Sequence, residues 1–381
     1  MLLEVKQPEL KKELKTALNG ISRSATMPIL KSFKLTAEDD RLHIEATDLE
    51  IGVKTSVSAK IMSEGSVCVP AKKLNSYIKE CAKTKPVKLE KKDNDNLDIQ
   101  CGASHTVLQG ANSDDFPSQP DLDSEVIKFD GDKFKNMLEK TKFCASDNEA
   151  KPFLCGVYLD FNEGELSVVG TDTYKLSCVN NDVNTDIDTN FILPTVTADT
   201  LVKELGDEVK FMFDEDSNLS KFKDGKTVIT SRLIEGDYPN YKQVIPEEKG
   251  TKFTLESDKL KGAIKRTMVT NEDDKIVNLN FEDDLIISNK ESESGYSEEE
   301  LEGELEGESY LTALNGDFML NYLKHIEGKI TIISQGRETP VLFKSKENDN
   351  FVHVMMPIRP SNRSEERRVG KECRSRWSPY H

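Results

Sequence analysis

Two nine-residue stretches that share a Thr-Asp pair at the same place indicate how this chain folds. Residues 45–53 read EATDLEIGV, and residues 169–177 read VGTDTYKLS. The Thr47-Asp48 pair of the first stretch returns as Thr171-Asp172, 124 positions later. Each pair stands at the end of an alternating run, where Thr and Asp favour a turn. The spacing predicts an internal repeat, which has to be settled before individual motifs are interpreted.

Predicted helices keep the same step. Residues 8–20 read PELKKELKTALNG, with Leu10, Leu14 and Leu18 on one apolar stripe between a proline start and a glycine stop. Similar segments are GDKFKNMLEKTKF at 131–143 and SDKLKGAIKRTM at 257–268. From Leu10 to Phe134 is 124 positions, and from Phe134 to Leu260 is 126. The chain is therefore predicted to be a triplication.

Further landmarks support three domains. A second predicted helix begins at Pro70 and again at Pro194, 124 positions apart, and Phe116-Pro117 and Tyr238-Pro239 close the first two copies. Between the helices lie alternating runs typical of antiparallel strands, at residues 31–47, 153–171, 275–289 and 328–335. A repeat of about 120 residues is large enough to fold alone. We expect domains at residues 1–122, 123–247 and 248–360.

Composition excludes several classes. The 381 residues are 36% hydrophobic and 32% charged, and no apolar run approaches the ~20 residues of a membrane helix. The start, MLLEVKQPELKKEL, does not resemble a secretory signal, so we expect a cytoplasmic protein. The seven cysteines form no CxxC pair, and buried thiols are their expected state. We expect no cofactor and no metal.

The last residues differ from the rest. Residues 363–381 read RSEERRVGKECRSRWSPYH, have no apolar periodicity and resemble a translated sequencing-library adapter. We interpret them as a non-native tail and rank a native basic arm below this. Removing its six basic and three acidic residues would move the formal net charge from -17 to -20.

The predicted helices are locally basic in an acidic chain. Any single Lys-rich face is explained by solvation alone. The bias recurs, however, at equivalent places of the repeats, and such segregation would draw DNA phosphates to one surface without reading sequence. These residues are Lys11, Lys12, Lys15, Lys72, Lys73, Lys79, Lys133, Lys135, Lys140, Lys142, Lys261, Lys265 and Arg266.

Six short motifs, in order on the triplicate frame, carry a family resemblance. They are MPIL at 27–30, ATDLE at 46–50, VPAKK at 69–73, GTDTYKLS at 170–177, SRLIEGDYPNY at 231–241 and VMMPIRP at 354–360. Residues 1 to about 360 resemble the bacterial beta sliding clamp, the processivity subunit of DNA polymerase III. The resemblance implies a non-catalytic protein.

The resemblance also implies an architecture. The fold would be α+β, with three repeated DNA-clamp domains, each two helices backed by antiparallel sheets. Two chains would close head to tail into a ring, which removes exposed sheet edges. The implied partners are double-stranded DNA, held non-specifically through the ring, and a second copy of the chain. DNA polymerase and the clamp loader would dock through short peptides, and no membrane is involved.

A peptide cleft between the second and third domains is implied as well. A Leu or Phe anchor of a peptide requires a preformed apolar groove, in which methionine is an adaptable wall. The matching apolar positions are Leu154, Thr171, Leu176, Pro239, Val244, Phe318, Pro340, Val354, Met355, Met356 and Pro357. The polar rim would be Lys151, Thr173, Tyr174, Lys175, Asn315 and Arg359. From the residues alone, an ordinary core edge strand is the preferred interpretation of VMMP, and the resemblance reverses this preference.

Other contacts follow from the resemblance. DNA would be contacted by Arg23, Lys72, Lys73, Lys79 and Asn148. The dimer contact would use His105 to Leu108 as a facing edge strand, with Met268 and Val269 as apolar anchors.

Some positions depart from the family pattern. Thr173 and Tyr174 replace a common glycine and histidine, Gln243 a basic residue, and Asp274 a rim aromatic. The acidic stretch 291–309 is longer than expected and is predicted to be a solvated loop or hairpin.

Two rival functions come from other classes. Asp48 and Asp172 would be a metal-dependent nuclease pair if they held Mg²⁺. Their equivalent places in two repeats favour a repeated structural turn instead. The second rival is a protein-only scaffold that keeps the fold but does not encircle DNA, which the basic helix faces disfavour.

Overall fold

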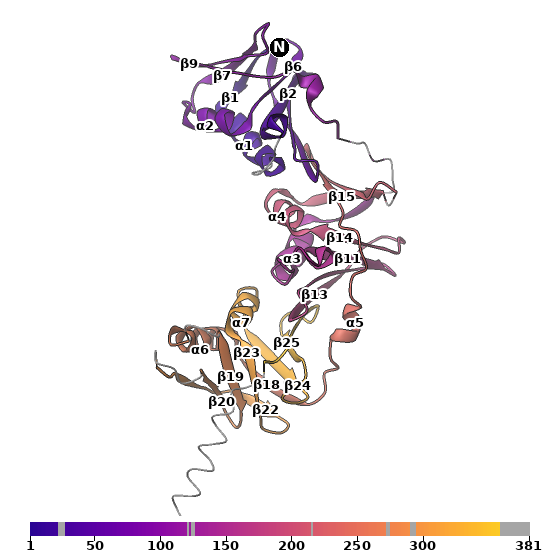
Figure 1. Cartoon of the computed structure of the whole chain (residues 1–381), viewed down its shortest axis with the longest axis vertical. Helices are drawn as coiled ribbons and strands as arrows, with labels where there is room; N and C mark the ends of the chain where they lie inside the picture. Colours follow the sequence, from indigo (N-terminus) through magenta and orange to yellow (C-terminus); the bar gives the residue numbers. More distant parts are fainter. Residues whose placement is uncertain are drawn as a thin grey trace, which may run out of the picture. The chain divides into compact units, whose positions relative to one another are not determined.

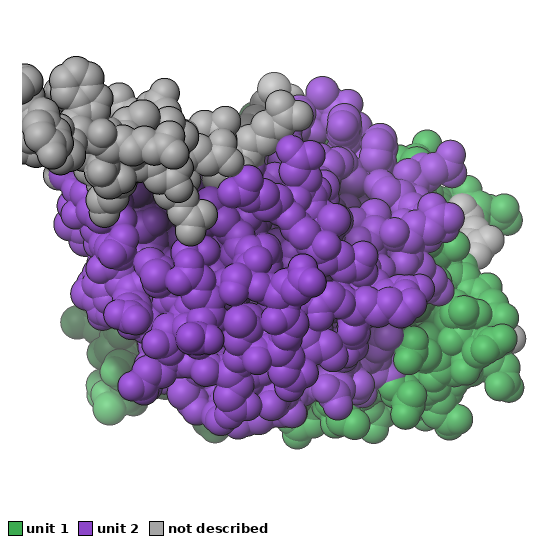
Figure 2. Space-filling view, turned by 90° about the horizontal axis from the view of Figure 1, so that it is seen from below, with its two compact units in different colours: residues 1–139, 155–166, 182–236 green, residues 140–154, 167–181, 237–381 purple. Residues whose placement is uncertain are grey.

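The computed structural model describes residues 1–21, 27–119, 122, 126–214, 216–271, 275–289 and 295–358. The chain divides into two compact units, coloured separately in Figure 2. Unit 1 comprises residues 1–139, 155–166 and 182–236, and unit 2 comprises 140–154, 167–181 and the chain from 237. The middle repeat contributes to both units, so the units do not coincide with the repeats.

The predicted helices are confirmed. They are α1 (Gln7–Ala17), α2 (Ala71–Glu80), α3 (Gly131–Lys142), α4 (Thr195–Glu204) and α6 (Ser257–Val269). Two helices were not assigned from sequence: α5 (Tyr241–Val244) has one turn, and α7 (Gly316–Leu323) is the second helix of the third repeat. Each repeat therefore has the two long helices that were predicted.

Unit 1 contains a five-stranded and an eight-stranded antiparallel sheet. The first has the order β5-β1-β7-β8-β9, formed by Lys60–Ser63, Leu2–Lys6, Pro86–Lys91, Leu97–Cys101 and Ser104–Leu108. The second has the order β10-β15-β16-β17-β4-β3-β2-β6, formed by Ile127–Asp130, Glu208–Asp214, Leu219–Asp224, Thr227–Arg232, Ile51–Ser58, Arg41–Thr47, Ser32–Glu38 and Gly65–Pro70.

Helices α1 and α2 lie side by side and cover one face of these sheets (Figure 1). Leu10 and Leu14 of α1 and Leu74 and Ile78 of α2 are completely buried in one apolar core. Helical spacing of these side chains leaves the lysines of both helices on the opposite face, while Glu13 of α1 is buried. Unit 1 also holds the antiparallel pair β11 (Gly156–Asn162) and β14 (Thr189–Pro194).

Unit 2 pairs strands from distant parts of the chain. Its larger sheet runs β13-β26-β25-β24-β18-β22, formed by Lys175–Asp182, Phe351–Met355, Val341–Ser345, Lys329–Ser334, Thr251–Glu256 and Glu304–Glu306. A four-stranded sheet runs β21-β20-β19-β23, formed by Glu298–Leu301, Leu285–Ser288, Ile276–Phe281 and Tyr310–Asn315. Strand β12 (Glu165–Thr171) crosses the border between the units.

The acidic stretch differs from its prediction. Residues 290–294 lie outside the described part, but the rest of the stretch contains two strands, β21 and β22. The two strands do not pair with each other. β21 pairs with β20, and β22 pairs with β18, so each is the edge of a different sheet. Glu298, Glu300, Glu304 and Glu306 are exposed, which discourages uncontrolled edge pairing, whereas Glu299 is paired with Arg266 of α6.

Candidate functional site

The second and third repeats are joined by strands β13 and β26. Leu176 lies opposite Val354, and Lys175 lies opposite Met355. The backbone N–H of Met356 then donates to the carbonyl oxygen of Tyr174, at 2.8 Å. Leu176 is 2% exposed and Val354 is 1% exposed, so this pair forms a buried apolar floor. The pairing brings together the GTDTYKLS and VMMP segments, both of which hold residues of the cleft that the resemblance implied.

The Thr-Asp turn is fixed by its own side chains. The Thr171 hydroxyl donates to the Lys175 carbonyl at 2.8 Å, and Asp172 Oδ1 accepts from the backbone N–H groups of Tyr174 and Lys175, both at 2.9 Å. Thr173 has a φ of 79°, a left-handed conformation that favours glycine. The hydrogen bonds of the turn stabilise this left-handed conformation at Thr173, although it is unfavourable for a threonine.

Lys175 differs from its predicted place on the rim. It is 8% exposed, forms an ion pair with Asp172, and lies with its Nζ 4.3 Å from the ring centre of Phe318. The carboxylate and the ring face together satisfy a buried ammonium group. Through Asp172 and Phe318, Lys175 therefore connects the Thr-Asp turn to helix α7.

Helix α7 is positioned by its cap. Asn315 Oδ1 accepts from the backbone N–H groups of Asp317 and Phe318, at 2.9 and 3.2 Å. This is the side-chain cap that helix starts favour. The N–H of Ile358 donates to the carbonyl of Ala313 at 2.8 Å, which holds Pro357 beside the same strand end. Asn315, Phe318 and Pro357 therefore lie near the end of β23 and the start of α7, and Asn315 acts mainly on the backbone.

Several of the candidate cleft residues have exposed apolar side chains. Tyr174 is 66% exposed, and Val244 and Met356 are each 40% exposed. Pro239, Pro340 and Pro357 are half-buried, Lys151 and Thr173 are exposed, and Leu154 and Met355 are buried. Pro340 directly precedes Val341, which lies opposite Met355. The Tyr238 hydroxyl donates to the Val169 carbonyl at 3.3 Å, which fixes Pro239 near β12. Arg359 lies outside the described residues.

A buried polar cluster that sequence reasoning missed lies under the floor. His353 of β26 lies opposite Ser177 of β13, and its Nδ1 is 2.7 Å from the Ser177 hydroxyl. The Cys144 thiol donates to the same hydroxyl at 3.2 Å. Burial, reinforced by Lys175, lowers the pKa of His353 to about 3, and burial raises the pKa of Cys144 to about 12. A neutral imidazole and a protonated thiol make this a structural cluster.

The predicted DNA-contact lysines lie on one helix face. Lys72, Lys73 and Lys79 of α2 are exposed, opposite the buried stripe of the same helix. Asn148 is exposed in unit 2, where its Oδ1 accepts from the N–H of Ala150 at 3.1 Å. Arg23 lies outside the described residues.

The predicted dimer residues divide into two groups. β9, which holds His105 and Leu108, is the edge strand of the five-stranded sheet. Val269 is 76% exposed at the end of α6. Met268 is half-buried, and its Sδ would lie 2.6 Å from a Cβ placed on Gly316. Met268 is therefore partly a packing residue of its own domain.

The structure explains the two Thr-Asp pairs as turns. Asp48 Oδ1 accepts from the N–H groups of Glu50 and Ile51 in the same pattern as Asp172. Within the described ranges, no three His, Cys, Asp or Glu side chains gather as metal ligands, and no disulfide joins the cysteines. Every helix in the same ranges is too short or too polar to cross a bilayer.

Comparisons with known proteins agree with this geometry. Models of the DNA polymerase III beta subunit match residues 1–120 (N-terminal domain), 128–240 (central domain) and 242–359 (C-terminal domain). The beta sliding clamp of Chlamydia muridarum is 24% identical over 366 residues, 94% of this chain and 99% of that protein. The beta sliding clamp of Staphylococcus aureus is 27% identical over 367 residues, 91% of this chain and 96% of that protein.

Solved structures show the same fold. A DNA polymerase sliding clamp from Bacillus subtilis superimposes with a TM-score of 0.90 at 23% identity, covering 95% of this chain and all of that one. The Caulobacter crescentus beta sliding clamp, with PEG bound to its putative beta-motif tethering region, has a TM-score of 0.89 at 27% identity, with 94% and 99% covered.

Three copies of one α+β domain, joined by antiparallel strands, define the sliding-clamp class. The chain belongs to the family of the DNA polymerase III beta subunit, the beta sliding clamps. The predicted function, a non-catalytic processivity factor for DNA polymerase, is confirmed by this membership.

Proposed function

We propose that two copies of this chain close head to tail into a ring around double-stranded DNA. The unpaired edges support this arrangement. β9 ends a sheet of the first repeat, while β21 and β22 end sheets of the third repeat. Pairing these edges between copies satisfies their open backbone groups. Val269, which is 76% exposed, would be covered by the partner.

DNA contact in the ring would be electrostatic. We assign it to Arg23, Lys72, Lys73, Lys79 and Asn148. The three lysines are exposed on one face of α2. Lysine binds phosphate as a point charge and reads no base. Contacts of this kind are weak and salt-sensitive, which permits sliding while the closed ring prevents dissociation.

The peptide cleft would recruit DNA polymerase and the clamp loader. The observation that supports it best is the β13–β26 register, which sets the buried Leu176–Val354 pair beside the exposed Tyr174 and Met356. A peptide anchor of Leu or Phe would bury apolar surface there, at about 25 cal/mol per Å². Lys151, Thr173 and Arg359 would contact the polar part of the peptide.

Polymerase processivity tests the ring and the cleft together. The assay is extension of primed circular DNA with a clamp loader, using the full chain and the chain cut after Pro360. We expect long products that depend on this protein and that are lost with Met356→Asp. Met62→Asp is the matched control, because Met62 is similarly exposed, at 45%, on strand β5.

The DNA surface needs its own variants. Lys72→Gln/Lys73→Gln/Lys79→Gln should shorten the products, whereas Lys249→Gln/Lys329→Gln/Lys346→Gln, which changes the charge equally in the third domain, should not. A stable dimer that gives no stimulation with a matched loader and polymerase would reject the ring in favour of a scaffold.

The remaining assignments are also proposals. We place the protein in the cytoplasm, where its DNA partner would be, and set the domain limits near residues 122 and 247. The dimer contact is checked by sedimentation: Val269→Asp should produce monomers, and an intact dimer would exclude Val269 from the interface.

A further inference from the structure

A row of lysines crosses the eight-stranded sheet of unit 1. Lys128 of β10 lies opposite Lys210 of β15, and Lys210 lies opposite Lys223 of β16. Lys223 lies opposite Val228, which in turn lies opposite Lys54 of β4. Neighbouring strands are about 4.8 Å apart, so the row of Lys128, Lys210, Lys223 and Lys54, here called the lysine row, spans about 19 Å.

The lysine row is on the sheet face opposite to helices α1 and α2. Side chains alternate between the two faces of a strand. Thr55, next to Lys54, points to α1, where its hydroxyl donates to the Glu13 carboxylate at 2.6 Å. Lys210 is likewise flanked by the buried Val209 and Phe211. DNA that touched α2 would therefore not reach the lysine row.

The charges of the lysine row are incompletely balanced. Lys54 pairs with Glu45 at 3.3 Å. Among the residues the structure describes, Lys128, Lys210 and Lys223 form no ion pair. Like charges directly opposite each other on a sheet are destabilising. Three such lysines in consecutive register, in a chain of net charge -17, form a surface that an external anion would stabilise.

The lysine row leads into a basic pocket. A cavity of about 350 Å³ is lined by Lys54, Lys223, Lys226, Arg41 and His43, with no carboxylate in its lining. Lys226 is paired with Glu13 at 2.7 Å, whereas within the described ranges Arg41 donates only to the Ser56 hydroxyl, at 3.0 Å from its Nε. Arg41 and Lys223 therefore keep donors available for a further acceptor.

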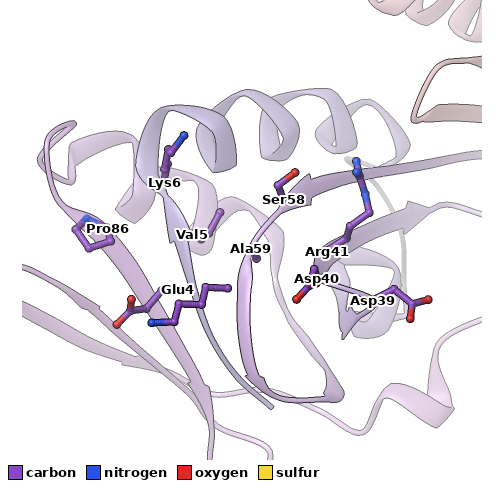
Figure 3. Close-up of a pocket in the computed structure, with 10 residues that line it drawn as sticks. Glu4, Val5, Lys6, Asp39, Asp40, Arg41, Ser58, Ala59 and Pro86 are labelled. Carbon is purple, nitrogen blue, oxygen red and sulfur yellow. The ribbon is translucent and has the colours of Figure 1, made fainter.

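A second cavity of unit 1 shows that this composition is not general. That cavity, of about 610 Å³, is lined by three acidic and three basic side chains (Figure 3). Glu4, Asp39 and Asp40 line it together with Lys6, Arg41 and Lys60, so its lining carries both signs of charge. The smaller pocket, by contrast, adjoins the lysine row, and its charged side chains are all basic.

We propose that the lysine row and the adjoining basic pocket bind the phosphate backbone of a nucleic acid, at a site separate from the helix face. Lysines favour phosphate as a partner without requiring planar geometry. No Phe, Tyr or Trp side chain belongs to the lysine row or lines the pocket, and His43 is the one ring in the pocket lining, so contact is mainly with phosphates. Binding is therefore independent of sequence and strongly dependent on salt.

The test compares the salt dependence of binding between matched variants. Fluorescence anisotropy of a 20-nucleotide single strand and a 20-base-pair duplex is recorded between about 25 and 200 mM salt. The row variant is Lys128→Gln/Lys210→Gln/Lys223→Gln. Its control, Lys249→Gln/Lys329→Gln/Lys346→Gln, changes the charge equally, and thermal unfolding verifies that both fold.

Counterion release sets the expected size. Each phosphate contact contributes about 0.7 to the slope of log affinity against log salt for a single strand, and about 0.9 for a duplex. Loss of three contacts should lower the slope by about 2 for a single strand or about 3 for a duplex. The form of nucleic acid that is bound is the one whose slope falls by its own expected amount, while the slope of a form that is not bound at the lysine row stays equal to that of the control.

Two results would overturn the inference. One is a row variant whose slopes equal those of the control. The other is tight, row-dependent binding of an acidic peptide, such as residues 295–309 of this chain, with no row-dependent binding of either oligonucleotide. The site lies wholly within unit 1 and does not require a ring. Loss of processivity with the α2 variant, alongside unchanged slopes in the row variant, would keep the proposed function and reject this site alone.

Discussion

Two strand junctions of this chain are built on the same frame but are lined differently. The first joins β4 to β17 in unit 1, and the second joins β13 to β26 in unit 2. Positions in the second junction are 124 higher than their equivalents in the first. Arg232 N–H donates to Glu50 O at 2.8 Å, as Met356 N–H does to Tyr174 O at 2.8 Å. The backbones match to the level of individual hydrogen bonds.

The side chains at the two junctions differ. The apolar Leu176–Val354 pair of the second junction corresponds to Gly52–Thr230 in the first. The space over Gly52 is taken by Gln119, whose Nε2 also donates to the Ala46 carbonyl at 3.3 Å. A repeated fold therefore supplies the place for a cleft, and side chains decide whether the place is apolar and open or polar and filled.

The largest expected effect comes from exchanging equivalent residues. Met356→Arg gives the second junction the residue found at Arg232 in the first. We expect the affinity for a clamp-binding peptide to fall roughly 30- to 150-fold, about 2–3 kcal/mol, because an apolar wall becomes charged. Fluorescence polarisation measures this. The reverse change, Arg232→Met, should leave the affinity unchanged, and an effect of equal size would move the cleft to the first junction.

Acid should destabilise the second junction selectively. Its buried His353 corresponds to Ile229 in the first. The pKa of His353 is about 3 in the folded chain and about 6.5 in the unfolded one, so between these values the unfolded state binds more protons and stability falls as the pH falls. From pH 7 to pH 5 the loss is about 2 kcal/mol.

His353→Gln removes this titration while an amide retains contact with Ser177. Urea unfolding of both proteins at pH 7 and pH 5, followed by hydrogen exchange of β26, should show a smaller acid effect in the variant. An identical acid effect in both would exclude His353 as its source.

The first junction should depend on a polar contact instead. Glu13 of α1 is 2% exposed and accepts from Thr55 and from Lys226 of the middle repeat, at 2.6 and 2.7 Å. Lys226→Gln removes the counter-charge of a buried carboxylate, and we expect a loss of about 1–2 kcal/mol, moderated because Lys226 is half-exposed. Urea unfolding measures it. Lys249→Gln, which breaks an exposed pair with Glu247, should cost under about 0.5 kcal/mol.

The smallest expected effect concerns the contact between Gly52 and Gln119, which distinguishes the first junction from the second. A Cβ on Gly52 would lie 2.7 Å from the amide of Gln119. Gly52→Ala should therefore destabilise the chain by about 1–2 kcal/mol, and by about 1 kcal/mol less in a Gln119→Ala background. A double-mutant cycle in urea measures this coupling. Additive effects would show that Gln119 does not restrict the first junction.

Much of the fold was predictable because it repeats. Three copies of the same apolar stripe and turn fix helix positions and strand order, since the periodicity of each pattern is set by local geometry. The Thr-Asp turn was also predictable, because its hydrogen bonds lie within four residues. α7 was missed because its sequence is apolar nearly all round and lacks a charged face.

The candidate site was predictable only through the family resemblance. Where residues of the site lie differently from the prediction, the reason is a tertiary contact. Lys175 was expected on the rim of the cleft because lysine is usually exposed. It is buried because it contacts Asp172 and Phe318, and Phe318 is more than 140 positions away in the sequence. Met268 was expected at a dimer surface, but Gly316 lets it pack within its own domain. Contacts between distant residues leave no periodic signal in the sequence.

The sequence by itself determined three α+β repeats, the turns between their strands and the segregation of lysine onto helix faces, since these depend on neighbouring residues. Only the tertiary structure decided that Ser177 meets His353, that Gln119 fills the first junction, and that Lys128, Lys210 and Lys223 stand in one row. Strand register brings such residues together, and register is set by the packing of the whole sheet.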